Sequence, residues 1–143
     1  MSDAQPTGRI AGIDYGTKRI GVAITDASQT IASPLDNYDR CGPDGDTRYF
    51  KRLVEDEQIT RFVVGLPIHL SGDESEKSRE ARQFAKWLQE VTSLPVDLYD
   101  ERFTTAHAES ALLDAGLTNK KRKKRRDMLA AQIILASYLE SQR

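Results

Sequence analysis

The chain has 143 residues, of which 38% are hydrophobic and 30% are charged, an ordinary balance for a soluble protein. It contains no apolar run long enough to cross a membrane, so we expect no membrane partner. The single cysteine, Cys41, excludes an internal disulfide framework and fits a reducing cytoplasm. We therefore expect a cytoplasmic protein with a flexible N-terminal tail, residues 1–8, and a single domain, residues 9–143.

The net charge of −1 is unevenly distributed along the chain. Residues 120–126 are seven consecutive lysines and arginines out of a total of 21, so the remainder carries 14 basic and 22 acidic residues, a net charge of −8. Positive charge gathered in one segment favours a polyanionic partner. The alternatives are a solvated helix start, a localisation-like stretch or a disordered tail.

The first half of the chain indicates three strands and a helix. Residues 9–24 read as a β-hairpin, because two apolar runs flank a short polar turn. Thr30–Leu35 predicts a third strand, with Pro34 marking a sheet edge or a strand end. An amphipathic helix follows the loop at 41–46, and we expect its N-cap at Asp44 or Asp46.

The next elements alternate between strand and helix. Residues 61–67 are continuously apolar, which is typical of a parallel strand buried on both faces. A further strand is expected over residues 94–101. Between these strands lies an amphipathic helix. Its apolar face contains Ala81, Phe84, Leu88 and Val91.

Two more helices complete the chain. The third helix begins at Thr104 or Thr105 and stops at Gly116, and the last begins within the basic run and continues to Leu139. The element order predicts an α/β fold. We expect a mixed five-stranded sheet, with three antiparallel strands and then two strands reached through helical crossovers, flanked by helices.

Asp14 interrupts the first apolar run near the end of its strand. Alternation places it on the same face as Ile10 and Gly12, where burying a carboxylate is costly without a cation or strong hydrogen bonds. The alternative is that Asp14 accepts hydrogen bonds from the turn amides of Gly16 and Thr17.

A second acidic pair, Asp100 and Glu101, ends the predicted strand 94–101. That strand is expected to be buried, and its C-terminal end is where open α/β sheets build sites. Alternation sends the two carboxylates to opposite faces, so one of them points into a site on a given face. The alternative is that both are solvated, with Arg102 as their counter-charge.

A third acid, Asp127, falls in the middle of the apolar stripe of the last helix. At about 100° per residue, the stripe also contains Ala131, Ile134, Leu135 and Tyr138, so Asp127 is predicted to face the sheet. The alternative is that Asp127 pairs with the preceding positive charges or is stabilised by the helix dipole in the N-terminal region of the helix.

Asp14, Glu101 and Asp127 thus come from three separate elements and are each expected at one end of the sheet. Carboxylates brought together raise one another's pKa or collect a cation. Such hard oxygen ligands suit Mg²⁺ or Mn²⁺. Beside a basic surface, this pattern predicts two-metal phosphodiester hydrolysis, in which one ion activates a water and the other stabilises the leaving oxygen.

Four segments resemble the YqgF/RuvX family of pre-16S ribosomal RNA nucleases, which are also labelled Holliday junction resolvases. They are residues 12–23, residues 64–67, residues 100–105, and residues 120–124 followed by Asp127 and Ala130-Ala131. The resemblance implies an RNase H-like fold and cleavage of structured RNA at the 5′ end of the ribosomal precursor. It also implies that Asp14, Glu101 and Asp127 are the metal-binding catalytic acids.

The basic residues indicate where the nucleic acid binds, and the resemblance indicates where this chain departs from the family. Phosphate contacts are expected from the hairpin turn, from the strand end and from the basic run. These contacts involve Lys18, Arg19, Arg102, Lys120, Lys121, Arg122, Lys123 and Lys124. His69 stands where the family usually has Asn, and His69 and His107 are not assigned to the catalytic set.

Three other functions fit parts of the sequence. A DNA nuclease that resolves four-way junctions would use the same acids in a dimer, and both a monomer and a homodimer fit the sequence. A non-catalytic adaptor in transcription or ribosome assembly would need the basic run alone. A phosphotransferase related to actin-like sugar kinases fits the Asp-x-Gly-Thr hairpin, but the chain lacks the second hairpin and the adenosine-binding segment.

Overall fold

A computed structural model gives the fold of residues 8–104 and 119–143, with helical backbone alone for residues 119–127. Residues 1–7, the predicted helix ending at Gly116 and His107 lie outside the described residues. Over the described ranges, every helix is too short or too polar to cross a bilayer.

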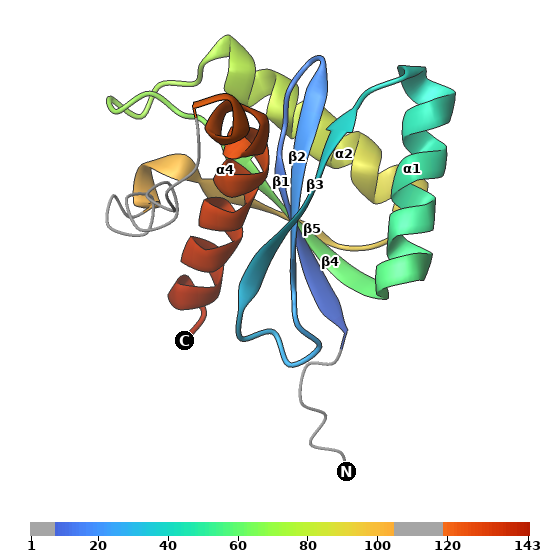
Figure 1. Ribbon diagram of the computed structural model, residues 1–143. Helices are drawn as coiled ribbons and strands as arrows, with labels where there is room; N and C mark the ends of the chain where they lie inside the picture. Colours follow the sequence, from blue (N-terminus) through green and yellow to red (C-terminus); the bar gives the residue numbers. More distant parts are fainter. Residues whose placement is uncertain (1–7, 105–118) are drawn as a thin grey trace.

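Five strands form one mixed sheet in the order β3-β2-β1-β4-β5 (Figure 1). β1 pairs antiparallel with β2, and β2 pairs antiparallel with β3. β4 is parallel to both of its neighbours, β1 and β5. The predicted sheet, with three antiparallel strands and two crossover strands, is therefore confirmed. The strands are β1 Arg9–Asp14, β2 Arg19–Thr25, β3 Ala32–Asp39, β4 Ile59–Leu66 and β5 Val96–Asp100.

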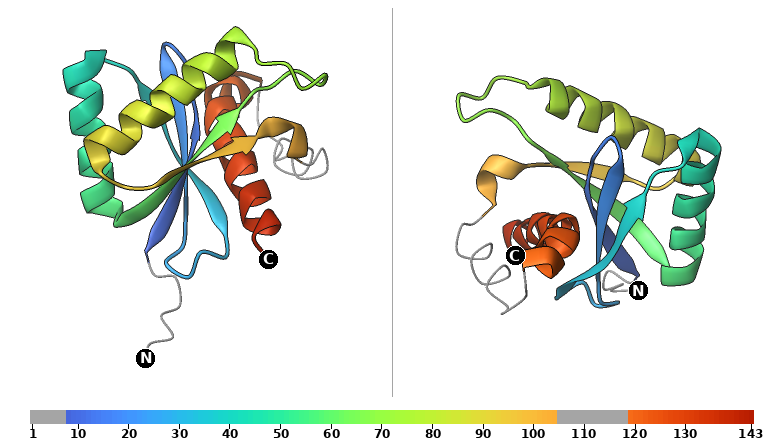
Figure 2. Two further views of the ribbon diagram at one scale, coloured as in Figure 1. Left: turned by 180° about the vertical axis from the view of Figure 1, so that it is seen from behind. Right: turned by 45° about the horizontal axis from the view of Figure 1, so that its top comes forward.

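Helices cover both faces of the sheet in three layers (Figure 2). α1 (Gly42–Glu57) and α2 (Glu76–Thr92) pack on one face, and α4 (Asn119–Ser141) packs on the other. A short 3₁₀ helix, η1 (Glu101–Phe103), follows β5. The larger core lies under α1 and α2. Its buried side chains include Ile13, Val22, Phe50, Phe62, Val64 and Leu88.

The burial of the strands follows their place in the sheet. Central β4 is buried on both faces, as predicted, and Phe62 and Val63 are fully enclosed. The expectation that the strand before Asp100 is buried is wrong, because β5 is an edge strand and Leu98 is 38% exposed. β3 is the other edge, which agrees with the placement of Pro34.

The start of α1 differs from the prediction. The helix begins at Gly42 with Cys41 as N-cap, because Pro43 is accommodated in the first turn, where its missing N–H costs no hydrogen bond. Asp44 and Asp46 are therefore inside the helix. Asp46 is buried and accepts a hydrogen bond from the backbone N–H of Cys41 at 3.1 Å.

The apolar stripes of the other two helices are confirmed. In α2, which starts from a capping box at Ser75, the stripe packs on the sheet. Its members Ala81, Phe84 and Leu88 are buried. In α4, Ala131, Ile134 and Leu135 are buried against the opposite face.

Gly12 sets the distance between α4 and β1, the strand that ends in Asp14. A Cβ at this position would lie 2.7 Å from Cβ of Leu135 and 3.1 Å from the carbonyl oxygen of Ala131. Neither atom can swing away, since both belong to the helix itself or to the base of a side chain. The helix therefore rests directly on the strand backbone.

We expect Gly12→Ala to lower the free energy of unfolding by about 1–3 kcal/mol, the usual cost of overpacking. Urea denaturation followed by circular dichroism measures the change. Leu70→Ala is the control, because the side chain of Leu70 is 92% exposed and its loss should change stability by less than about 0.5 kcal/mol. Equal stabilities for Gly12→Ala and the unaltered protein would show that α4 does not press on β1.

Candidate active site

Three parallel strands end at the same edge of the sheet. Ile13 of β1 is level with Val64 of β4, so Asp14 comes level with Gly65. Leu66 of β4 pairs with Asp100 of β5, so Glu101 follows immediately beyond that edge. The register of β1, β4 and β5 thus brings two predicted site acids to one edge of the sheet.

Asp14 and Glu101 line the same small pocket, whose volume is about 50 Å³. The other lining residues come from the hairpin turn, from β4 and the residue after it, and from α2. They are Tyr15, Gly65, Pro67, Lys77 and Ala81. The structure therefore brings together two of the three predicted acids, and it adds a cation, Lys77.

Gly65 makes room for the carboxylate of Glu101. A Cβ on Gly65 would lie 2.8 Å from Oε2 of Glu101 and 2.5 Å from Cδ1 of Ile134. Burial raises the pKa of Glu101 above its ordinary value, while Lys77 lowers it and Asp100 raises it further. A carboxylate whose ionisation is penalised in this way is stabilised by a bound cation.

Lys77 is a pocket residue that the sequence analysis missed. It lies in the first turn of α2, two residues after the N-cap Ser75. Its position has a recognisable signal, because Lys77 extends the apolar stripe of Ala81 and Phe84 by one helical turn. Asp127 extends the stripe of α4 in the same way, and a charge on such a stripe marks a site candidate.

Asp100 and Glu101 have different environments, because β5 ends at Asp100 and Glu101 begins η1. Arg102 forms a two-pronged contact with Asp100, in which Nη2 is 2.6 Å from Oδ2 and Nε is 3.1 Å from Oδ1. These hydrogen bonds lower the pKa of Asp100, which also caps η1 by accepting from the backbone N–H of Arg102. Arg102 is thus the counter-charge of Asp100, while Glu101 lines the pocket.

The direction of α4 carries its N-terminal half toward the edge where Asp14 lies. At its other end, Arg143 Nη2 donates to the carbonyl oxygen of Thr30, beside the β2–β3 connection, at 3.0 Å. Figure 1 shows the helix running from that connection to the opposite end of the sheet. Asp127 belongs to this half, but its side chain lies outside the described residues, as do those of the basic run.

The remaining predicted residues are placed as follows. Lys18 is exposed in the β1–β2 turn, Arg19 is exposed at the start of β2, and His69 is exposed in the loop after β4. Among the described residues, no three His, Cys, Asp or Glu side chains gather where they could share a metal ion. The described side chains do not include that of Asp127, the third acid expected at this edge.

The architecture is shared with proteins that resolve DNA junctions. Thermus thermophilus RuvC, solved with a Holliday junction substrate, matches with a TM-score of 0.63 and 14% identity over 94% of this chain and 95% of that chain. The fowlpox virus resolvase, solved with junction DNA, matches with a TM-score of 0.59 and 14% identity over 94% and 98%. These likenesses confirm the predicted RNase H-like fold.

Closer relatives are recognised by sequence. A protein of Rhodopirellula baltica is 51% identical over 94% of this chain and 78% of its own length, and one of Dictyoglomus thermophilum is 41% identical over 93% and 96%. Both bear the name "Putative pre-16S rRNA nuclease". The family model RuvX, described as Holliday junction resolvase, matches residues 8–141. Over nearly its whole length, therefore, the chain belongs to the RuvX family.

Proposed function

We propose that this protein is a divalent-metal-dependent endonuclease that hydrolyses phosphodiester bonds of RNA in the 5′-end maturation of pre-16S ribosomal RNA. The meeting of Asp14 and Glu101 in one pocket beside Lys77 carries the proposal. The proposal is also supported by the match to the RuvX family and by the two similar proteins that are named as nucleases. With such a substrate, we expect the protein to act in the cytoplasm.

The residues of the pocket fit a divalent ion. Asp14, Glu101 and Asp127 would hold Mg²⁺ or Mn²⁺, since carboxylate oxygens are the ligands these ions prefer. The raised pKa of Glu101 and the presence of a second carboxylate, Asp14, in the same pocket both favour a cation there. When bound, a pair of such ions supplies a water nucleophile at neutral pH and neutralises charge on the phosphoryl oxygens.

The lysine and arginine side chains have separate roles in binding the substrate. Lys77 lies in the pocket, where its ammonium group attracts the phosphate to be cleaved and offsets the repulsion between that phosphate and the acids. Lys18 and Arg19 follow Asp14 along the chain and Arg102 follows Glu101, and with the basic run Lys120–Lys124 they bind neighbouring phosphates. Because such binding releases counterions, affinity for RNA falls steeply as salt rises.

Asp14→Asn and Glu101→Gln should each lower kcat by about 10²–10⁴-fold, since a metal ion supplies several kcal/mol of transition-state stabilisation. Cleavage of a labelled pre-16S fragment with Mg²⁺ measures the loss. Asp39→Asn, which changes an exposed carboxylate at the end of β3, is the matched control and should keep the original rate. Cleavage by Asp14→Asn at the original rate would show that the site is assigned wrongly.

Glu101→Gln should also raise the melting temperature at pH 8 without divalent ions, by about 1–4 °C. Because the folded state raises the pKa of Glu101, its ionisation costs stability, and this cost appears as pH rises from 4.5 through the folded pKa. At pH 4 the two proteins should therefore melt together. Thermal denaturation followed by circular dichroism gives both temperatures.

Adding Mg²⁺ at pH 8 should reverse that order, because an ion that binds the folded state stabilises the unaltered protein and not Glu101→Gln. An equal response of both proteins to Mg²⁺ would contradict a metal site at Glu101.

A second candidate function is cleavage of four-way DNA junctions. It is favoured by the description of the RuvX family and by the junction DNA in the structures of RuvC and the fowlpox resolvase. We expect the pre-16S fragment to be cleaved at least about 10-fold faster than a junction at equal concentration, when both are assayed with one preparation and Mg²⁺. Faster cleavage of the junction would replace the RNA proposal with the DNA one.

A further inference from the structure

The connection between β1 and β2 follows Asp14 directly, so its conformation determines where that carboxylate points. It comprises residues 15–18, too few for a structure of their own. The turn is tight at Gly16, where a Cβ would collide with the carbonyl oxygen of Arg19. A turn this short is held in place by contacts with other elements.

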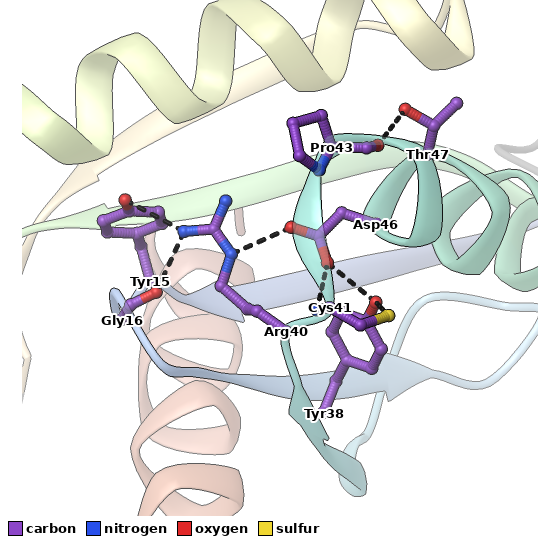
Figure 3. Close-up of polar contacts among 8 residues, drawn as sticks. All are labelled: Tyr15, Gly16, Tyr38, Arg40, Cys41, Pro43, Asp46 and Thr47. Carbon is purple, nitrogen blue, oxygen red and sulfur yellow. Dashed lines mark hydrogen bonds and ion pairs between the residues drawn. The ribbon is translucent and has the colours of Figure 1, made fainter.

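Arg40, the residue after β3, contacts the turn through its side chain and its backbone, and Figure 3 shows the side-chain hydrogen bonds. Its Nη1 donates to Oη of Tyr15 at 3.1 Å and to the carbonyl oxygen of Gly16 at 3.3 Å. Its backbone N–H donates to the carbonyl oxygen of Lys18 at 2.9 Å. The guanidinium carbon also lies 5.3 Å from the centroid of the Tyr15 ring, within the range of a cation–π contact.

Asp46 holds the other side of the same guanidinium group. Nε of Arg40 donates to Oδ2 of Asp46 at 3.0 Å, and the Asp46 side chain is 1% exposed. Oδ1 of Asp46 accepts from Oη of Tyr38 at 2.7 Å and from the backbone N–H of Cys41 at 3.1 Å. Burial raises the pKa of Asp46, but these hydrogen bonds together lower it below its ordinary value, so Asp46 stays ionised.

Tyr15 connects this cluster to the candidate active site. It lines the pocket that contains Asp14 and, on its other side, a cavity of about 270 Å³ beside Arg40 and Asp46. Its ring also packs against Phe84 of α2, with the ring centroids 4.9 Å apart. A displacement of the guanidinium group therefore reaches the neighbour of Asp14 through one side chain.

We propose that Arg40, anchored by Asp46, is a positioning residue that holds the β1–β2 turn so that Asp14 keeps its place beside Glu101. This role in catalysis rests on the proposed function, whereas the placement of the turn is a property of the metal-free protein. A positioning role for Arg40 also agrees with the chemistry of its ion pair with Asp46. Buried ion pairs contribute little to stability compared with apolar residues of the same volume, but they fix geometry through directional hydrogen bonds.

Arg40→Lys is the decisive variant, because lysine keeps a positive charge for Asp46 but lacks the planar fork that also reaches Tyr15 and Gly16. Arg40→Met removes every side-chain donor. Arg48→Met, an exposed arginine of α1, is the matched control. Hydrogen exchange of amides 15–18 is measured in the metal-free proteins, and the dissociation constant of Mn²⁺ is then measured by calorimetry.

We expect the turn amides to exchange about 10-fold faster in Arg40→Lys, and faster still in Arg40→Met. The exchange rate of the Phe62 amide, in central β4, should be unchanged in Arg40→Lys. The dissociation constant of Mn²⁺ should rise about 10–100-fold, as it does when a group that orients a metal ligand is lost. The Arg48→Met control should match the unaltered protein in both measurements.

Unchanged exchange in the turn, or faster exchange with unchanged Mn²⁺ affinity, would overturn the proposal. Arg40 would then be a structural residue whose loss lowers the melting temperature alone. If the unaltered protein neither binds Mn²⁺ nor cleaves RNA, the proposed function fails. Exchange in the turn then decides separately whether Arg40 holds it.

Discussion

The direct contact of α4 with the backbones of β1 and β4 is the constraint on which the candidate site depends. At Gly12 and Gly65 a side chain would collide with Leu135 and Ile134, so the helix lies closer to the sheet than ordinary side chains allow. This closeness carries the N-terminal half of α4 over the edge where β1 and β4 end. The space left at Gly65 is the space that Glu101 enters.

The pocket at this edge brings the carboxylates of Asp14 and Glu101 together, which costs stability in the folded protein. Burial raises the pKa of Glu101, and the neighbouring Asp100 raises it further, although Arg102 binds Asp100 in a two-pronged contact. Lys77 relieves part of the remaining cost. An acidic pocket of this kind is less stable empty than with a cation bound, and the apolar core under α1 and α2 supplies the stability that offsets it.

Asp14 is fixed from both sides of the sheet. Its strand is pressed against α4 at Gly12, and the turn that follows it is held by Arg40 on the side of α1 and α2. The ion pair of Arg40 with Asp46 has a role here that an apolar pair could not fill, because the hydrogen bonds to Tyr15 and Gly16 are directional. The chemistry of the candidate site thus extends into a cluster that shares one residue, Tyr15, with the pocket.

Hydrophobic periodicity and element order by themselves determined the types of the described elements, the mixed sheet, and the apolar stripes of α2 and α4. They also marked Asp14 and the pair Asp100 and Glu101, which interrupt or end apolar strands, but they did not choose between Asp100 and Glu101. Local signals were wrong for the N-cap of α1 and for the burial of β5, which depends on strand order in the sheet. Tertiary structure alone decided that Lys77 enters the pocket and that Arg40 reaches across to the β1–β2 turn. The reason is physical: periodicity reports which face of an element is buried, whereas contacts between elements depend on register and strand order, which no local pattern encodes.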